Sequence, residues 1–307
     1  MKIIKSKDSF LFNVIYSLTL LCLFQSQLFG AQNKGPKLHY FSSLQDSSLK
    51  EQSFIGRGPV RVHLPRNYRN YKKLPLILSL HGFGSSPLLH EGLFKIRKLV
   101  SKKQFILATL PGGHNKAGIR FWNAGDWCCD FFKSGRDDES YILHVLKRLK
   151  KLYKVDEKKV VILGHSNGAF MGHRMLCHYP EVFSGVISLA GAMPKGIGPC
   201  KQAKGASILQ IHGKDDIVIK YKGTPNHVGA KTTTRFWTNA FQCTEEPSKV
   251  NNRIVVKLGQ WPKRLNKKTW SQCYESSKVA LWSISREGHI IDLTNRMRSR
   301  MIDFVLN

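Results

Sequence analysis

One segment of the chain combines a nucleophilic side chain with the backbone freedom that would expose it. Ser166 is the centre of the pentapeptide 164–168, Gly-His-Ser-Asn-Gly, which directly follows the apolar run 160–163. A β-branched run of this kind predicts a buried strand, and residues 169–176 have the pattern of a helix. Glycine at both ends of the pentapeptide allows a tight turn with the serine hydroxyl at its tip. The pattern predicts a serine nucleophile at a strand-to-helix turn; an idle serine in a glycine-rich turn is the alternative.

A serine hydroxyl needs a general base, and the base needs an acid that orients it. The run 207–211 predicts a strand, and Asp215 and Asp216 follow it; solvated turn formers are the alternative for both. The last strand-like run leads to His289. Position singles out His289 among the twelve histidines, because a fold with this order of elements delivers its base after the final strand. His227 is the main rival, since it also follows the aspartates.

Backbone N–H groups near the serine could stabilise negative charge on a substrate oxygen. Residues 75–80 form a strand-like run that ends in the glycine-containing segment 81–86. Glycine lets the backbone approach a bound substrate closely. We expect the N–H groups of Phe83 and Asn167 to form an oxyanion hole. Taken alone, the segment 81–86 is equally compatible with an ordinary turn.

The candidate residues occur in the chain order of an α/β-hydrolase: oxyanion loop, nucleophile, acid and base. Strand-like runs alternate with helical stretches such as 141–153, which has a buried apolar stripe and two acids, Asp137 and Asp138, before it. The sequence predicts an α/β fold with a doubly wound, mostly parallel sheet flanked by helices. We expect an N-terminal extension over 32–54 and one catalytic domain over 55–307.

The chain resembles the secreted poly(3-hydroxybutyrate) depolymerase and feruloyl/acetylxylan esterase family of α/β-hydrolases. The matching segments are 62–65, 80–82, 121–124 with Cys128-Cys129, 137–138, 164–168, 180–183, 212–221, Cys243, Cys273 and 288–289. The resemblance implies Ser166 as nucleophile and His289 as base. It favours Asp216 over Asp215, because the family acid is the fifth residue counted from the matching His-Gly.

Two features depart from the family pattern and bear on the substrate. Family members commonly carry a Trp-Pro pair soon after the histidine, whereas Ile-Ile-Asp-Leu follows here at 290–293. No appended carbohydrate- or polymer-binding module is apparent. We therefore expect feruloyl, acetyl or short hydroxyacyl esters to be preferred over crystalline polyester. A prolyl-peptidase-like serine amidase and a non-catalytic cationic protein that binds an envelope surface or polyanion are the alternatives.

The first thirty residues have the features of a secretory signal peptide. Three lysines precede an apolar stretch from residue 10 to about residue 24, and small residues follow at Gly30 and Ala31. The apolar stretch is shorter than the roughly 20 residues that span a bilayer. We expect residues 1–31 to be removed. The mature protein would then be secreted or periplasmic, without a stable membrane span.

Removal of that peptide would leave six cysteines, and an even number in an exported chain favours disulfides. They are Cys128, Cys129, Cys177, Cys200, Cys243 and Cys273. The adjacent pair is expected to bond elsewhere, because a direct bond between neighbours would be strained. The family resemblance suggests that Cys243 pairs with Cys273, which leaves Cys177 and Cys200 for the adjacent pair. No cysteine or histidine pair has zinc-ligand spacing, so neither a metal nor another cofactor is expected.

The formal net charge of +29 is unusually high for a chain of 307 residues. Basic clusters at 147–151 and 262–268 are expected to be solvated faces. No helix-turn-helix, zinc finger or RNA-binding signature accompanies them. Nonspecific attraction to anionic surfaces is therefore expected, and a specific nucleic-acid partner is not.

Overall fold

The structure is a computed structural model that describes residues 37–41, 57–125, 127–198, 200, 205–244, 246–254 and 263–307. The expected signal peptide, residues 1–31, lies outside the described residues. Within the described ranges no helix is both long and apolar enough to cross a membrane.

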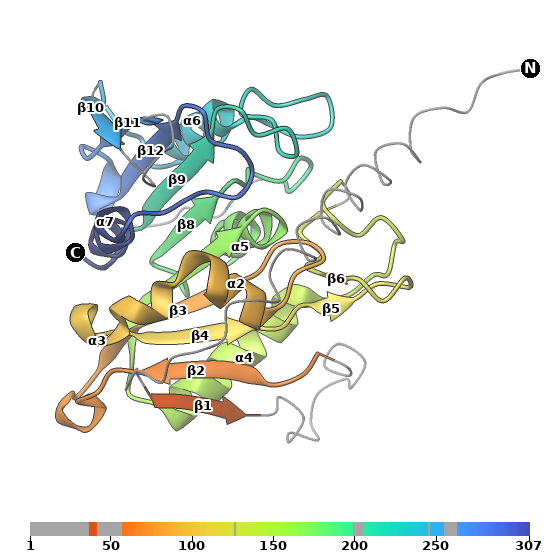
Figure 1. Cartoon of the computed structure of the whole chain (residues 1–307), viewed down its shortest axis with the longest axis vertical. Coiled ribbons are helices and arrows are strands. Elements are labelled where there is room, and N and C mark those ends of the chain that lie inside the picture. Colours follow the sequence, from red (N-terminus) through yellow and green to blue (C-terminus); the bar gives the residue numbers. More distant parts are fainter. Residues whose placement is uncertain are drawn as a thin grey trace, which may run out of the picture. The chain divides into compact units, whose positions relative to one another are not determined.

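Ten of the described strands form one mixed sheet in the order β1-β2-β4-β3-β7-β8-β9-β12-β11-β10 (Figure 1). Their bounds are β1 (Lys37–Phe41), β2 (Val60–Leu64), β3 (Leu74–Leu80), β4 (Ile106–Leu110), β7 (Val155–His165), β8 (Gly185–Leu189), β9 (Ser207–Gly213), β10 (Ser248–Ile254), β11 (Lys263–Trp270) and β12 (Lys278–Ile284). The central strands from β4 to β12 are parallel, and the pairs at both edges are antiparallel. β1 belongs to the segment 32–54, where we expected an extension, and it pairs with β2 at one edge of the sheet. A separate ribbon contains β5 (Gly113–His114) and β6 (Arg120–Phe121).

Helices cover both faces of this sheet. They are α2 (Pro87–Phe94), α3 (Val100–Lys103), α4 (Asp138–Leu152), α5 (Asn167–His178), α6 (Ala230–Ala240) and α7 (Asn295–Leu306), with short 3₁₀ turns η2 (Tyr68–Asn70), η3 (Ile96–Leu99) and η4 (Tyr274–Ser276). Successive strand residues face opposite sides, so Ile162 packs with Phe170 of α5 and Trp237 of α6, whereas Val161 packs with Phe94 and Met301 beneath α2 and α7. The predicted doubly wound α/β-hydrolase fold is confirmed.

The helix expected at 141–153 begins three residues earlier, at Asp138. Asp137 caps it, because its side chain accepts a hydrogen bond from the N–H of Ser140 at 2.9 Å. Asp138 instead turns into the interior, where its carboxylate lies 2.6 Å from Nη1 of Arg57 and both side chains are inaccessible to solvent. The two neighbouring acids thus have different functions, one at the helix terminus and one in a buried ion pair.

All six cysteines form disulfides, but the expected pairing was wrong for four of them. Cys243 bonds to Cys273, as the family resemblance suggested. Cys177, near the end of α5, bonds to Cys200. Cys128 and Cys129 bond to each other across a cis peptide with their Cα atoms 2.9 Å apart. The correction follows from tertiary proximity, because Cys177 and Cys200 lie beside each other and leave the adjacent pair no other described cysteine.

Candidate active site

Ser166 occupies the turn between β7 and α5, as predicted, with φ 52° and ψ −121°. This left-handed backbone is uncommon for a residue with a side chain and is characteristic of a nucleophile elbow. Close packing explains the flanking glycines: a Cβ at Gly164 would lie 2.2 Å from the oxygen of Gly168, and one at Gly168 would lie 2.3 Å from the oxygen of Leu80. Only glycine at both positions lets the turn fold against the end of β3.

Asp216 and His289 meet at the carboxyl ends of the neighbouring parallel strands β9 and β12. His289 Nδ1 lies 2.8 Å from Asp216 Oδ2. The other carboxylate oxygen accepts the N–H groups of Val218 and Ile219, each at 2.9 Å. The acid is therefore held on both oxygens, and its carboxylate points at the histidine ring.

The two rival residues are placed differently. Asp215 is exposed, and its backbone N–H donates to the oxygen of Glu287. His227 is buried; its Nδ1 lies 3.0 Å from the oxygen of Val228, and its ring packs on Trp127 with centroids 4.9 Å apart. Among the four candidates from the sequence, the structure pairs Asp216 with His289.

Asp216 also lies beside a second histidine. His212 Nε2 is 3.2 Å from Asp216 Oδ2 and 2.7 Å from the oxygen of Ile219. Burial by itself would raise the pKa of Asp216, but hydrogen bonds and charge from His212 and His289 hold that pKa well below its usual range. The acid is thus a carboxylate at any pH at which the protein would work.

His212 connects the acid to a buried chain of polar side chains. Its Nδ1 accepts from Gln210 Nε2 at 3.2 Å, and Gln210 Oε1 lies 3.2 Å from His173 Nε2. Trp237 Nε1 then donates to His173 Nδ1 at 3.0 Å. Burial lowers the pKa of His173 to about 4, so its ring is neutral and Nδ1 can accept. The network secures Asp216 to α5 and α6, and sequence reasoning missed it, although alternation along β9 places Gln210 and His212 on one face.

The segment 81–86 lies against the elbow: a Cβ at Gly82 would be 3.4 Å from Cβ of Ser166. The N–H groups of Gly84 and Ser85 donate to backbone oxygens, whereas that of Phe83 donates to no acceptor in the described part of the chain. Asn167 is the first residue of α5, so its N–H has no acceptor within the helix. Two backbone donors are thus left over on the segments that flank the serine.

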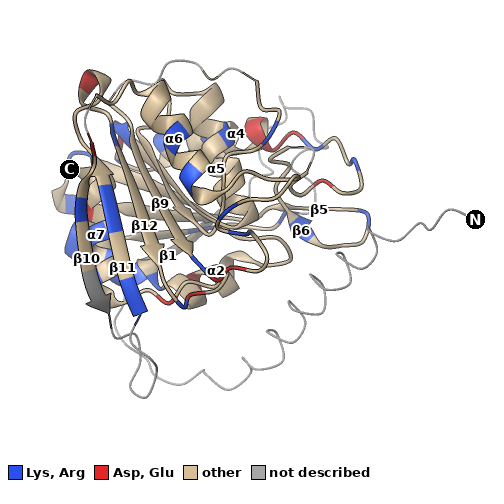
Figure 2. Cartoon of the chain, turned by 90° about the horizontal axis from the view of Figure 1, so that it is seen from above, with Lys and Arg blue, Asp and Glu red and all other residues tan. Residues whose placement is uncertain are grey.

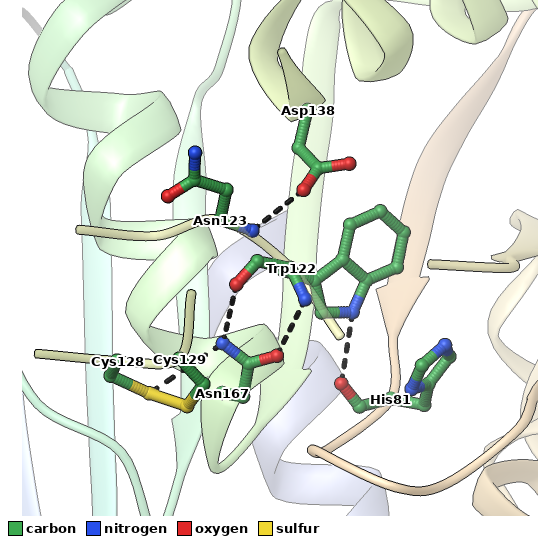
Figure 3. Close-up of a disulfide and its surroundings, with 7 residues drawn as sticks. All are labelled: His81, Trp122, Asn123, Cys128, Cys129, Asp138 and Asn167. Carbon is green, nitrogen blue, oxygen red and sulfur yellow. Dashed lines mark hydrogen bonds between the residues drawn. A yellow bond between two sulfur atoms is a disulfide. The ribbon is translucent and has the colours of Figure 1, made fainter. Parts of the chain in front are cut away.

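Trp122 ties these two segments together, which the sequence had indicated only as part of the family resemblance (Figure 3). The side chain of Asn167 accepts from the N–H of Trp122 at 2.7 Å and donates to its oxygen at 2.8 Å. The indole of Trp122 donates to the oxygen of His81 at 3.0 Å. Cys128 Sγ lies 3.5 Å from Asn167 Nδ2, so the disulfide of adjacent cysteines packs against the same amide. One residue therefore links the oxyanion-loop candidate to the helix that follows the serine.

Aromatic rings surround these segments. Phe83 packs edge-on against the exposed Phe131, with ring centroids 5.5 Å apart. Trp127 packs on Phe170 of α5 as well as on His227. Among the described residues, no three histidine, cysteine or carboxylate side chains are grouped to hold a metal ion. The surroundings offer apolar ring surface and backbone donors.

The comparisons with known proteins identify the family of the chain. Residues 52–277 match the model of the family described as "Putative esterase", and the chain belongs to that family. The matched range includes Ser166 and Asp216 and ends before His289.

Two curated relatives and one solved structure are similar to the chain. Feruloyl esterase B of Piromyces equi is 26% identical over 75% of this chain and 42% of that protein. A bifunctional acetylxylan esterase/xylanase of Neocallimastix patriciarum is 22% identical over 85% of this chain and 35% of that protein. The chain thus spans less than half of either relative. An acetyl xylan esterase from Aspergillus awamori shares the fold, with a TM-score of 0.58 and 14% identity over 87% of this chain and 99% of that chain.

Proposed function

We propose that the protein is an exported serine esterase that hydrolyses carboxylic esters with Ser166, His289 and Asp216 as its catalytic triad. The observation that carries the proposal is the pairing of His289 with a carboxylate that is held on both oxygens, 2.8 Å away. Ser166 on a strained elbow supplies the nucleophile for which such a pair is the usual base. Membership of the esterase family supports the same reaction class.

In the proposed mechanism, Ser166 Oγ attacks the ester carbonyl while His289 Nε2 takes its proton. Asp216 orients His289 and stabilises the imidazolium that forms. The N–H groups of Phe83 and Asn167 hold the oxyanion of the tetrahedral intermediate. His289 then gives its proton to the leaving alcohol, and water releases the acyl group by the same steps. The reaction needs no cofactor.

The proposed substrates are feruloyl and acetyl esters of plant cell-wall polysaccharide, with short hydroxyacyl esters as a further class. The two relatives, a feruloyl esterase and an acetylxylan esterase/xylanase, support the first two acyl groups. The aromatic rings of Phe83, Phe131 and Trp127 suit a planar aromatic acyl group such as feruloyl. Three disulfides among the described cysteines support an exported protein, since such bonds persist in oxidising compartments.

Labelling with a fluorophosphonate probe, followed by an ester panel, tests the proposal. Labelling should occur on Ser166 and be absent in Ser166→Ala. The panel compares methyl ferulate, acetylated xylan, hydroxybutyrate oligomers and a crystalline polyhydroxybutyrate film. We expect turnover of soluble esters and poor clearing of the film. A protein that folds but is neither labelled nor active would support the non-catalytic alternative.

An amidase would use the same triad, and substrates that differ only in their leaving group distinguish it from an esterase. Matched ester and anilide substrates with one acyl group should show a large preference for the ester. Faster turnover of a prolyl anilide than of every ester in the panel would make the protein a peptidase.

A further inference from the structure

A hollow lies beside the proposed triad acid, Asp216, and is not used by the proposed reaction. Its volume is about 980 Å³. It is bounded by the loop after β9, by α6, and by the adjoining strands β11 and β12. Cavities of roughly 300–1,000 Å³ hold most small-molecule ligands. The hollow is therefore large enough for a short oligosaccharide.

Strand alternation builds the floor of this hollow. Asn266, Lys268 and Trp270 are alternate residues of β11, and Leu281 and Ser283 are alternate residues of β12. These five residues lie on the face of the sheet that is turned towards α6, since Leu281 packs with Ala230 of α6. The opposite face of β11 is used differently: Lys267 lies over the ring of Trp282, 4.0 Å from its centroid. The floor of the hollow is thus the sheet surface that adjoins α6.

The rim of the hollow is strongly basic. Six exposed cations line it, against two carboxylates. The cations are Lys214, Lys220, Lys222, Lys231, Arg235 and Lys268. None of them forms an ion pair with another described residue, whereas the carboxylate of Asp216 is buried and already bonded to His289. Figure 2 shows the basic segments of α6 and β11 that contribute to this rim. Uncompensated positive charge around a concave surface selects an anionic ligand.

Aromatic and hydroxyl groups accompany the charge. Trp270 is half-buried in the floor and offers ring surface. Thr234 and Thr238 of α6 also line the hollow, and their hydroxyls donate to backbone oxygens of the same helix. Tyr221 also lines the hollow; its hydroxyl is 2.6 Å from Ser283 Oγ, and its ring packs edge-on against His212, centroids 5.8 Å apart. An aromatic face with nearby hydroxyl and cationic groups matches a sugar ring that carries a carboxylate. A nucleic-acid site would instead follow several successive phosphates along an extended stripe.

We propose that this hollow binds a uronic acid residue of the polysaccharide whose esters the enzyme cleaves, a statement that rests on the proposed function. The lysines and Arg235 bind the sugar carboxylate, and Trp270 contacts the sugar ring. Because the hollow adjoins Asp216, a chain bound there runs close to the triad. The hollow thus selects acidic over neutral regions of the polysaccharide.

Calorimetric titration of the full chain with trigalacturonic acid tests this site without using esterase activity, since the probe contains no ester. The pocket variant is Arg235→Gln with Lys268→Gln. The matched control is Lys147→Gln with Lys151→Gln, which removes the same charge from exposed positions on α4. A second pocket pair, Lys222→Gln with Lys231→Gln, repeats the test on different elements. Melting curves by circular dichroism establish that each variant is folded.

We expect the unchanged protein to bind trigalacturonic acid and to bind the neutral trisaccharide maltotriose at least about tenfold more weakly. Each pocket pair should raise Kd for trigalacturonic acid by about tenfold or more, the effect of losing one good charged contact. The control pair should change it by less than about twofold. Equal losses in pocket and control variants would overturn the proposal, as would equal binding of maltotriose. Tighter, pocket-dependent binding of hexathymidylate would assign the site to nucleic acid instead. Because trigalacturonic acid contains no ester, each of these outcomes can be interpreted even if the fluorophosphonate probe does not label Ser166.

Discussion

His165 Nε2 lies 3.1 Å from the backbone oxygen of His289, so the residue before the elbow serine holds the loop that carries the partner of Asp216. A carbonyl oxygen only accepts, and Nε2 must therefore carry the proton. Burial lowers the pKa of His165 to about 3, which keeps its ring neutral. The ring centroids of His165 and His289 lie 4.9 Å apart. We assign His165 as a positioning residue, because its hydrogen bond to the backbone of His289 holds the His289 loop in place relative to Ser166.

Replacing His165 by Phe keeps a planar ring and removes the donor. We expect kcat to fall by about 10- to 100-fold with little change in KM, because a shift of about 1 Å in a catalytic group has an effect of this size. His165→Gln, which retains an N–H donor, should recover part of the loss. The exposed His39 provides the control substitution His39→Phe. If KM changed by as large a factor as kcat, or if His165→Phe kept full activity, the contact would not position the base.

The proposed triad should behave as a unit in kinetics. Ser166→Ala, His289→Ala and the double variant should lose nearly the same rate, about 10⁶-fold in kcat, and Asp216→Ala about 10⁴-fold. His227→Ala and Asp215→Asn serve as controls and should be mild by comparison, because neither side chain is among the described groups that form hydrogen bonds or ion pairs with Asp216 or His289. Single-turnover and steady-state rates on one soluble ester measure the series. A folded His227→Ala protein without activity, beside an active His289→Ala protein, would falsify the assignment.

The amide of Asn167 should matter for stability as well as for rate. Asn167→Ala removes both hydrogen bonds to Trp122 and leaves the buried N–H of Trp122 without a partner, whereas its oxygen still accepts from the N–H of Ala124. We expect the free energy of unfolding to fall by about 1–3 kcal/mol. Urea unfolding monitored by tryptophan fluorescence measures it. Asn239→Ala, at an exposed position of α6, should leave stability within about 0.5 kcal/mol; a similar loss in both variants would contradict the role of the Asn167 side chain.

Peptide mapping without reductant should recover three specific bridges: Cys128–Cys129, Cys177–Cys200 and Cys243–Cys273. The last two close loops of 23 and 30 residues, and a double serine variant of either should lose about 3–4 kcal/mol of stability. The adjacent pair closes almost no loop, so its serine variant should lose less through chain entropy. Alkylation of Cys177 or Cys200 in the unreduced protein would contradict the pairing.

Buried histidines should make the protein sensitive to acid. Burial lowers the pKa of His81 to about 4, of His165 to about 3 and of His173 to about 4, whereas the unfolded chain binds protons near pH 6.5. The unfolded state therefore takes up more protons below pH 6.5. The contribution of these histidines to the free energy of unfolding is therefore complete above that pH, and it is lost as the pH falls towards their folded-state pKa values. Each histidine contributes a slope of about 1.4 kcal/mol per pH unit in that window.

Urea unfolding at pH 7.5, 6.5 and 5.5 measures this slope. His173→Gln should make the slope shallower, whereas His39→Gln, at an exposed position, should leave it unchanged. A free energy of unfolding that stays constant or rises between pH 6.5 and pH 5.5 would contradict the burial of neutral histidines.

The sequence by itself determined the class of fold and the location of the elbow. Apolar runs followed by glycine at 75–86 and 160–168 are local signals, because a buried parallel strand needs apolar residues on both faces and the following turn needs glycine. The same local order identified Asp215, Asp216 and His289 as candidates, and the family resemblance favoured Asp216. The structure brings Asp216 within 2.8 Å of His289. Their catalytic roles remain predictions for the experiments above.

Tertiary structure alone decided the contacts between distant segments. Nothing local marks His165 as a donor to His289, 124 residues away, or joins His212 to Trp237 through Gln210 and His173. The cysteine pairing failed for the same reason: spacing along the chain does not say that Cys177 meets Cys200, which determines what is left for their neighbours. Local patterns reflect backbone geometry and burial, whereas pairings depend on which elements the folded sheet places side by side.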